Sequence, residues 1–155
     1  MIPQDITARH VARYLLAVAH EHGSFLSNLK LQKLLYYSQG WHLGIYQAPL
    51  FPDKFEAWVH GPVIPALYHE FKKYSWRNID EEVDKPTFPA EIVEFLEELT
   101  GEYLHLDAYQ LERMTHRESP WLTARGDLPI DALSSTVIDE GLMREHFRAR
   151  VSPGV

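Results

Sequence analysis

Apolar residues recur at every third or fourth position through most of the chain, and this spacing constrains the fold more than any other feature. Such a spacing places side chains on one face of an α-helix. Residues 7–23 carry two adjacent rows of this kind: Val11, Leu15 and Val18, with Ala12, Leu16 and Ala19. Two rows predict a well-buried helix, capped by Asp5 or Thr7 and ending at Gly23.

A second helix is expected from Ser27 or Asn28, with its apolar face formed by Leu31, Leu34, Leu35, Trp41 and Ile45. Its polar positions fall largely outside this face: Lys30, Gln32, Lys33 and Gln39. Gly40 and Gly44 are predicted to mark where the helix weakens or ends. Tyr36 and Tyr37 point about 100° apart on a helix, so they are not expected to share one pocket. Core packing is one interpretation of these aromatics, and a surface that reaches a groove or a partner is the other.

Four prolines punctuate residues 48–65, where residues 55–59 are the short segment that reads as extended or β. Gly61 and Pro62 are predicted to turn the chain into a third helix, which begins at Pro65 and runs through Tyr74. The polar residues 75–89 are expected to form a surface loop.

Further helices are expected in the C-terminal half. The first opens at Pro89 and closes at Gly101, and capping boxes at Asp107 with Gln110 and at Thr136 with Asp139 start two others. Residues 119–121 read as the cap and first turn of a short helix. The sequence therefore predicts a mainly α fold, a compact single-domain bundle of residues 1–155 with about six to seven helices and a loose tail at 149–155.

The charge distribution disfavours a general binder of nucleic acid or membranes. Fifteen Lys and Arg against 22 Asp and Glu give a net charge of −7, which provides no overall attraction to polyanions. Eight acidic and two basic residues lie within residues 76–100, and the helix expected there exposes Glu91, Glu94, Glu97 and Glu98. This acidic face is either a solvated surface or a face that docks a basic partner.

We find no pattern that indicates catalysis, a cofactor or a metal site. The chain has no cysteine, its nine histidines match no metal-site spacing, and neither a nucleophile elbow nor a glycine-rich phosphate loop occurs. No apolar run approaches the roughly 18–20 residues of a membrane helix. We expect a cytoplasmic protein that is not an enzyme. A weaker alternative is a helix-turn-helix that presents Asn28, Lys30, Gln32 and Lys33 to DNA.

Three ordered blocks of sequence resemble the Panacea domain, the family of SocA-like and phage-associated GepA-like antitoxins. They are NLKLQKLLYY followed by GWH from residue 28, FEAWVHGPVIP from residue 55, and THRESPW with Arg125 from residue 115. The resemblance covers about residues 7–148. The motif residues, structural or partner-binding, are Asn28, Lys30, Gln32, Lys33, Tyr36, Tyr37, Glu56, Trp58, Gly61, Pro62, His116, Glu118, Pro120 and Trp121.

The resemblance implies an antitoxin that binds and neutralises a cognate protein toxin encoded by the adjacent gene. An adaptor that hands the toxin to the ClpXP protease is the alternative, and a DNA-binding regulator is a weaker one. Trp58 and Trp121 are expected to be buried, and Glu56, His116 and Glu118 are expected either to lock loops together or to contact the toxin. The chain is expected to be the bare domain without a separate DNA-binding module. Its oligomeric state is left open.

Overall fold

The computed structural model describes residues 5–151, which form seven α-helices, one 3-10 helix and four short strands. The helices are α1 (Ala8–Glu21), α2 (Asn28–Tyr46), α3 (Pro65–Glu70), η1 (Lys72–Tyr74), α4 (Ala90–Tyr103), α5 (Ala108–Thr115), α6 (Ser119–Arg125) and α7 (Glu140–Arg148). The strands are β1 (Leu26–Ser27), β2 (Glu56–Trp58), β3 (Gly61–Val63) and β4 (Asn78–Ile79). The predicted mainly α fold is confirmed. The end of the predicted loose tail, residues 152–155, lies outside the described residues.

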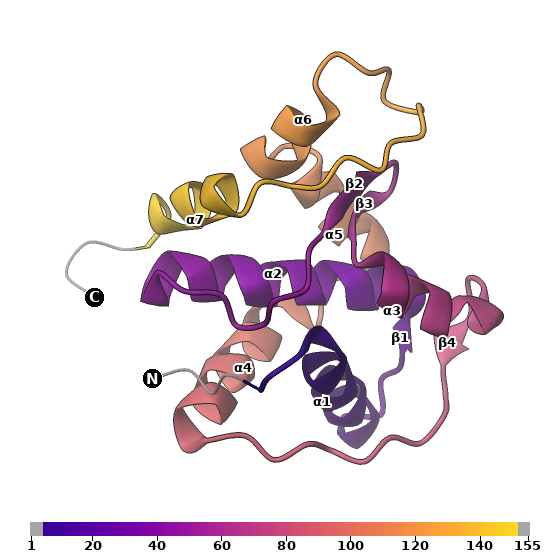
Figure 1. The fold of residues 1–155 in the computed structure, drawn as a ribbon. Helices are drawn as coiled ribbons and strands as arrows, with labels where there is room; N and C mark the ends of the chain where they lie inside the picture. The colour runs from indigo at the N-terminus through magenta and orange to yellow at the C-terminus, as the bar shows by residue number, and fades with distance from the viewer. Residues whose placement is uncertain (1–4, 152–155) are drawn as a thin grey trace.

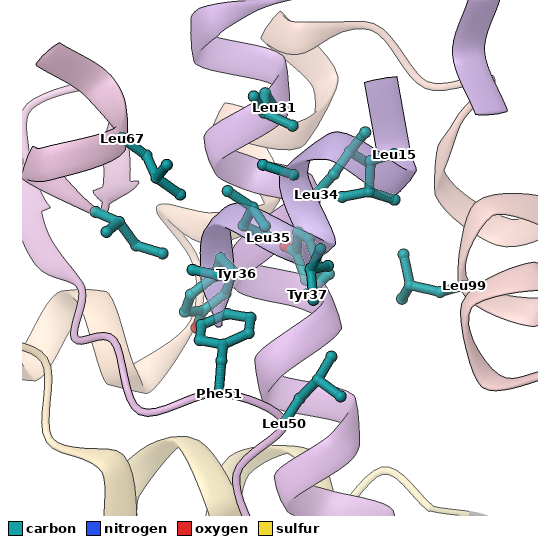
Figure 2. Packing of buried hydrophobic residues seen from close by; sticks show 14 of the residues in the cluster. Leu15, Leu31, Leu34, Leu35, Tyr36, Tyr37, Leu50, Phe51, Leu67 and Leu99 are labelled. Carbon is teal, nitrogen blue, oxygen red and sulfur yellow. The ribbon is translucent and has the colours of Figure 1, made fainter. Parts of the chain in front are cut away.

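Helix α2 runs through the middle of the molecule, with α1 and α4 on one side and α7 and the β2–β3 hairpin on the other (Figure 1). Fourteen of its 19 residues are buried, because neighbouring elements cover it on nearly every side. Side chains from four other segments approach it in Figure 2: Leu15, Phe51, Leu67 and Leu99. An all-round buried helix forms the core of this fold rather than one wall of it.

This burial corrects the predicted polar face of α2. Gln32, Lys33 and Gln39 are buried, whereas Ile45, expected in the core, is exposed in the last turn. Gln39 fits the interior because its side-chain amide bonds the backbone of the segment that follows α2. Its Oε1 accepts from the Leu50 amide at 2.8 Å, and its Nε2 donates to the Phe51 carbonyl at 2.7 Å.

The two glycines of α2 do not weaken or end the helix, contrary to the prediction. They face α7, where a Cβ at Gly40 would collide with the Phe147 ring and one at Gly44 would lie 2.8 Å from the Phe147 carbonyl carbon. The absence of side chains lets the two helices approach closely. Phe147 fills the resulting space and is fully buried.

Helix ends follow the local rules at some positions and depart from them at others. Thr7, one of the two predicted caps, caps α1 in a capping box with His10, and Asp107 forms the predicted capping box of α5 with Gln110. Helix α4, however, continues past Gly101. The N-caps of α6 and α7 are Glu118 and Asp139, one residue before the predicted Ser119 cap and three after the predicted start at Thr136.

Residues 55–63 form a hairpin, not a strand followed by a turn into a helix. Gly61 has φ +110°, a conformation that glycine adopts readily, and it pairs with Trp58 across the hairpin. Pro62 lies within β3 opposite Ala57. The Ala57 amide points away from β3 and donates to the Thr136 carbonyl at 2.9 Å. Ala57 and Pro62 therefore form no hydrogen bond with each other, and a proline, which lacks an N–H, is tolerated at this position of β3.

The predicted surface loop at 75–89 contains an anchor that the sequence analysis missed. Strand β4 pairs antiparallel with β1, which places Ile79 opposite Leu26. Both side chains are fully buried. None of the helices within residues 5–151 is long and apolar enough to cross a lipid bilayer.

Candidate partner-binding site

Buried amides of α2 position the start of α3. Gln32 Oε1 accepts from the Ile64 amide at 2.9 Å, and its Nε2 donates to Asn28 Oδ1 at 3.2 Å. Asn28 Nδ2 in turn donates to the Tyr68 carbonyl at 2.9 Å. The side chains of Gln32 and Asn28 therefore form their hydrogen bonds inside the protein. The burial of Asn28, Gln32 and Lys33 contradicts the helix-turn-helix alternative, because a recognition helix must expose such groups to base edges.

The two motif lysines also serve the interior. Lys30 is half-buried and its Nζ donates to the Leu104 carbonyl at 2.6 Å, where it holds the end of α4. Burial lowers the pKa of Lys30. Lys33 is only 1% exposed and its Nζ has no hydrogen-bond partner among the described residues. Burial lowers the pKa of Lys33 to about 7, with Glu112 opposing the shift.

Tyr36 and Tyr37 are both fully buried, which confirms core packing for this pair and contradicts the alternative that one of them reaches a partner. Their rings meet edge to face with centroids 5.2 Å apart. The Tyr37 hydroxyl donates to Glu118 Oε2 at 2.9 Å, and Arg150 Nη1 lies 3.4 Å from the same oxygen. Burial raises the pKa of Glu118, and these two contacts oppose the shift. Glu118 thus joins segments that are distant in the sequence, as expected: it bonds Tyr37 on α2 and Arg150 after α7.

The third motif block locks α6 onto the hairpin. His116 stacks on Trp121 with centroids 4.1 Å apart, and burial lowers the pKa of this histidine. Trp121 and Pro120 are buried, as predicted for Trp121. The indole Nε1 of Trp121 donates to the Trp58 carbonyl at 2.8 Å. The interior of the C-terminal half therefore fixes the backbone of β2.

Trp58 itself is not buried in the core, contrary to the prediction. Its side chain is half-exposed, meets Tyr68 edge to face at 5.0 Å, and donates from Nε1 to Glu56 Oε1 at 2.9 Å. Glu56 therefore orients a surface tryptophan and does not join distant loops. The two residues belong to the wall of an open hollow.

We call this hollow, with a volume of about 520 Å³, the hairpin groove. The residues that line it come from the start of α2, the hairpin, α3 and the segment before α7: Leu29, Glu56, Trp58, Val59, His60, Val63, Tyr68, Leu133, Ser134 and Ser135. Apolar and aromatic side chains form most of its surface. His60 is paired with Glu112 at 3.1 Å.

The segment between α6 and α7, residues 126–138, borders the groove and exposes four large apolar side chains; we call it the apolar loop. The exposed fractions are 91% for Leu133 and 69% for Ile130, with Leu128 and Val137 also exposed. Isolated exposed apolar residues are common on proteins, but a concentration beside a hollow is typical of an interaction surface.

A buried arginine holds the apolar loop in place. Arg125 is 4% exposed and lies over the Trp121 ring at 4.9 Å. Its guanidinium donates to the carbonyls of Pro129 and Ala132 at 2.9 and 2.7 Å, to that of Ile130 at 3.3 Å, and to that of Ala57 at 3.1 Å. One side chain thus ties the loop to β2, and the Thr136–Ala57 and Ile138–Phe55 backbone bonds complete the attachment.

Sequence reasoning missed the apolar loop. A signal was present, since residues 126–138 contain Leu128, Ile130, Leu133 and Val137 in a segment interrupted by Gly126 and Pro129 and followed by a capping aspartate. Apolar residues in a segment that a glycine and a proline keep out of a helix indicate an exposed apolar surface. Arg125 was noted only as part of a motif block.

The predicted acidic face lies elsewhere. Glu91, Glu94, Glu97 and Glu98 are all exposed on α4, which lies on the opposite side of α2 from the hairpin in Figure 1. The structure thus places two separate candidate surfaces on the protein, one acidic and one apolar. Within residues 5–151, no group of three His, Asp or Glu side chains is arranged to hold a metal ion.

Comparison with known proteins gives two matches. The family model described as "Antitoxin SocA-like, Panacea domain" matches residues 31–122, from within α2 to within α6. The protein named Antitoxin SocA from Caulobacter vibrioides (strain NA1000 / CB15N) is 46% identical over 69 residues. This segment covers 44% of the chain but only 37% of the relative's length. No solved structure matches.

Proposed function

The chain belongs to the SocA-like antitoxin family that is defined by the Panacea domain, and from this premise we propose that it neutralises a cognate protein toxin by direct protein–protein binding. The matched relative bears the name of an antitoxin. Because the shared segment covers 37% of that relative, the neutralising activity is our proposal for this chain. The toxin is expected to be the product of the adjacent gene.

The observation that carries this proposal is the apolar loop beside the hairpin groove. Leu133 is 91% exposed on a loop that Arg125 and two backbone bonds hold in a defined conformation. A pre-ordered apolar surface loses little conformational entropy when a partner covers it. Most of the motif residues are buried in the interior, whereas this apolar surface, with Glu56 and Trp58 beside it, is exposed and suited to binding a folded protein.

Neutralisation would proceed by occlusion. The antitoxin docks on the toxin and covers its active site or the route by which substrate reaches it. A few large apolar side chains supply most of the affinity in such interfaces, and charges set the orientation and the rate of encounter. The exposed carboxylates of α4 are suited to the second role with a basic toxin.

The test is to express the adjacent open reading frame under tight control, with and without this chain, and to measure growth and co-purification. Growth arrest relieved by this chain, together with a stoichiometric complex, supports the proposal. Absence of relief, with the antitoxin present in soluble form, contradicts it. Relief that disappears in a host lacking ClpXP, without a stable complex, replaces occlusion with the adaptor mechanism.

A further inference from the structure

We infer that the hairpin groove anchors a segment of the partner in which a large apolar side chain stands next to a lysine or arginine. The inference rests on the proposed function only in taking the partner to be a protein. It specifies which of the two candidate surfaces makes the anchoring contact and which side chains of the partner it accepts.

The shape and lining of the groove specify the apolar half of this recognition. Its volume of about 520 Å³ falls within the roughly 300–1,000 Å³ of sites that enclose a small ligand. The edge-to-face pair of Trp58 and Tyr68 forms one wall, and Leu29 and Leu133 contribute to the rest. Aromatic walls of this kind pack well against an aromatic or branched aliphatic side chain.

The charges around the groove specify the cationic half. Glu56 lines the groove and uses Oε1 to accept from the Trp58 indole, while no ion pair within residues 5–151 involves its carboxylate. Asp127 and Asp131 are exposed on the apolar loop. The nearby Asp139 and Glu140 are already engaged, one as the cap of α7 and the other in an ion pair with Lys54, so Glu56, Asp127 and Asp131 carry the available negative charge. A cation beside the anchoring residue would therefore meet complementary charge.

The rigidity of the surroundings fixes the geometry of both halves. The Trp58 carbonyl is held by Trp121, the Tyr68 carbonyl by Asn28, and the apolar loop by Arg125. Three sides of the groove are thus positioned by buried side chains. A preformed site of this kind selects for a particular arrangement of apolar and charged groups in the occupant.

The experiment uses the purified full chain as bait for a phage-displayed library of random dodecapeptides, which requires no knowledge of the toxin. Selected peptides are then synthesised and their affinities measured by fluorescence anisotropy. The variants are Leu133→Asp and Glu56→Lys at the groove, with Trp76→Asp as matched control. Trp76 is an 83% exposed aromatic that does not line the groove. Circular dichroism melts verify that each variant is folded.

We expect the selected peptides to share an aromatic or branched aliphatic residue adjacent to Lys or Arg. Leu133→Asp and Glu56→Lys should each weaken binding at least about tenfold, as for a residue that contributes more than 1.4 kcal/mol, and Trp76→Asp should leave binding unchanged. Replacing the peptide's basic residue with alanine should weaken binding to the wild-type chain and not to Glu56→Lys. The inference would be overturned if the selected peptides lacked a basic residue or if they bound Leu133→Asp as tightly as the wild-type chain. It would also be overturned if the library yielded no peptides that bind the wild-type chain in preference to Leu133→Asp.

The outcome is separable from that of the proposed function. Peptide binding at the groove together with failure to relieve any toxin would reject the antitoxin role and leave the recognition chemistry standing. Relief of toxicity by Leu133→Asp and Glu56→Lys as efficient as by the wild-type chain would reject the groove as the anchor and leave the antitoxin role standing.

Discussion

Replacement of the buried Lys33 with methionine should stabilise the protein, and should do so in a pH-dependent way. Lys33 is 1% exposed, and its Nζ has no hydrogen-bond partner among the described residues. Methionine keeps a linear side chain of similar length and removes the amine that burial disfavours in its charged form. The neighbouring packing is otherwise unchanged.

The magnitude follows from the pKa. Burial lowers the pKa of Lys33 from 10.5 to about 7, so between these values the folded state holds fewer protons than the unfolded state, and stability rises with pH. At about pH 7 this difference in proton binding lowers the free energy of unfolding by about 4 kcal/mol relative to a chain with an uncharged side chain at position 33. At about pH 9 about 2 kcal/mol remains, because deprotonation of the unfolded chain then costs less.

The assay is urea unfolding, followed by circular dichroism, of the wild-type chain, Lys33→Met and the exposed control Lys72→Met at pH values of about 7, 8 and 9. The difference in unfolding free energy between Lys33→Met and wild type should shrink by about 2 kcal/mol over this range. Other titrating groups cancel in the difference. A difference that stays constant with pH would refute the reasoning, since it would mean that the amine keeps its proton in the folded state.

The close contact between α2 and α7 makes Gly44 sensitive to substitution. Gly44→Ala should lower the free energy of unfolding by about 1–3 kcal/mol by forcing α7 away from α2. Gly101→Ala, where a Cβ meets nothing within 4 Å, should raise it by about 0.5–1 kcal/mol. Urea unfolding compares the two variants, and equal effects would contradict the packing argument. Arg125→Lys should speed amide hydrogen exchange in residues 129–137 and leave α2 unaffected, and unchanged exchange would show that the arginine does not hold the loop. Trp58→Ala should lower stability by less than the about 3–5 kcal/mol of a fully buried tryptophan, as measured by thermal unfolding. The threefold charge reversal Glu94→Lys, Glu97→Lys and Glu98→Lys on α4 should leave the melting temperature unchanged, because exposed charges contribute about 0–1 kcal/mol each. It should slow association with the toxin at low salt, and an unchanged association rate would exclude that face as part of the interface.

The sequence predicted those parts of the fold that depend on neighbours a few residues apart. The cap at Thr7, the capping box at Asp107 and the buried face of α4 are set by local spacing, and the structure contains all three. The extended segment at 55–59 was also predicted, but its partner strand was not. Gly61 and Pro62 are both turn-forming residues, and only the hydrogen bond from Ala57 to Thr136, 79 residues further along the chain, makes room for a proline in β3.

The sequence placed several polar residues of the candidate site wrongly, because their burial depends on contacts with distant parts of the chain. Lys33 and Gln32 look like surface residues in any helical projection of α2, since their burial depends on elements from distant parts of the chain that cover this helix. Trp58 looks like a core residue because of its size. Its partial exposure follows from its place on the wall of the hairpin groove, which segments distant in the sequence form together.

The burial of α2 and of most of the third motif block separates the scaffold of this protein from its exposed loop. Most of the motif residues occupy the interior, where packing or an internal hydrogen bond constrains them, whereas Glu56 and Trp58 line the hairpin groove. The loop that presents Leu133 and Ile130 is held mainly through backbone carbonyls, and these are present whatever the side chains are. The side chains of the apolar loop can therefore change while the bonds that anchor its backbone remain, so under the function proposed above the same scaffold can present a different binding surface.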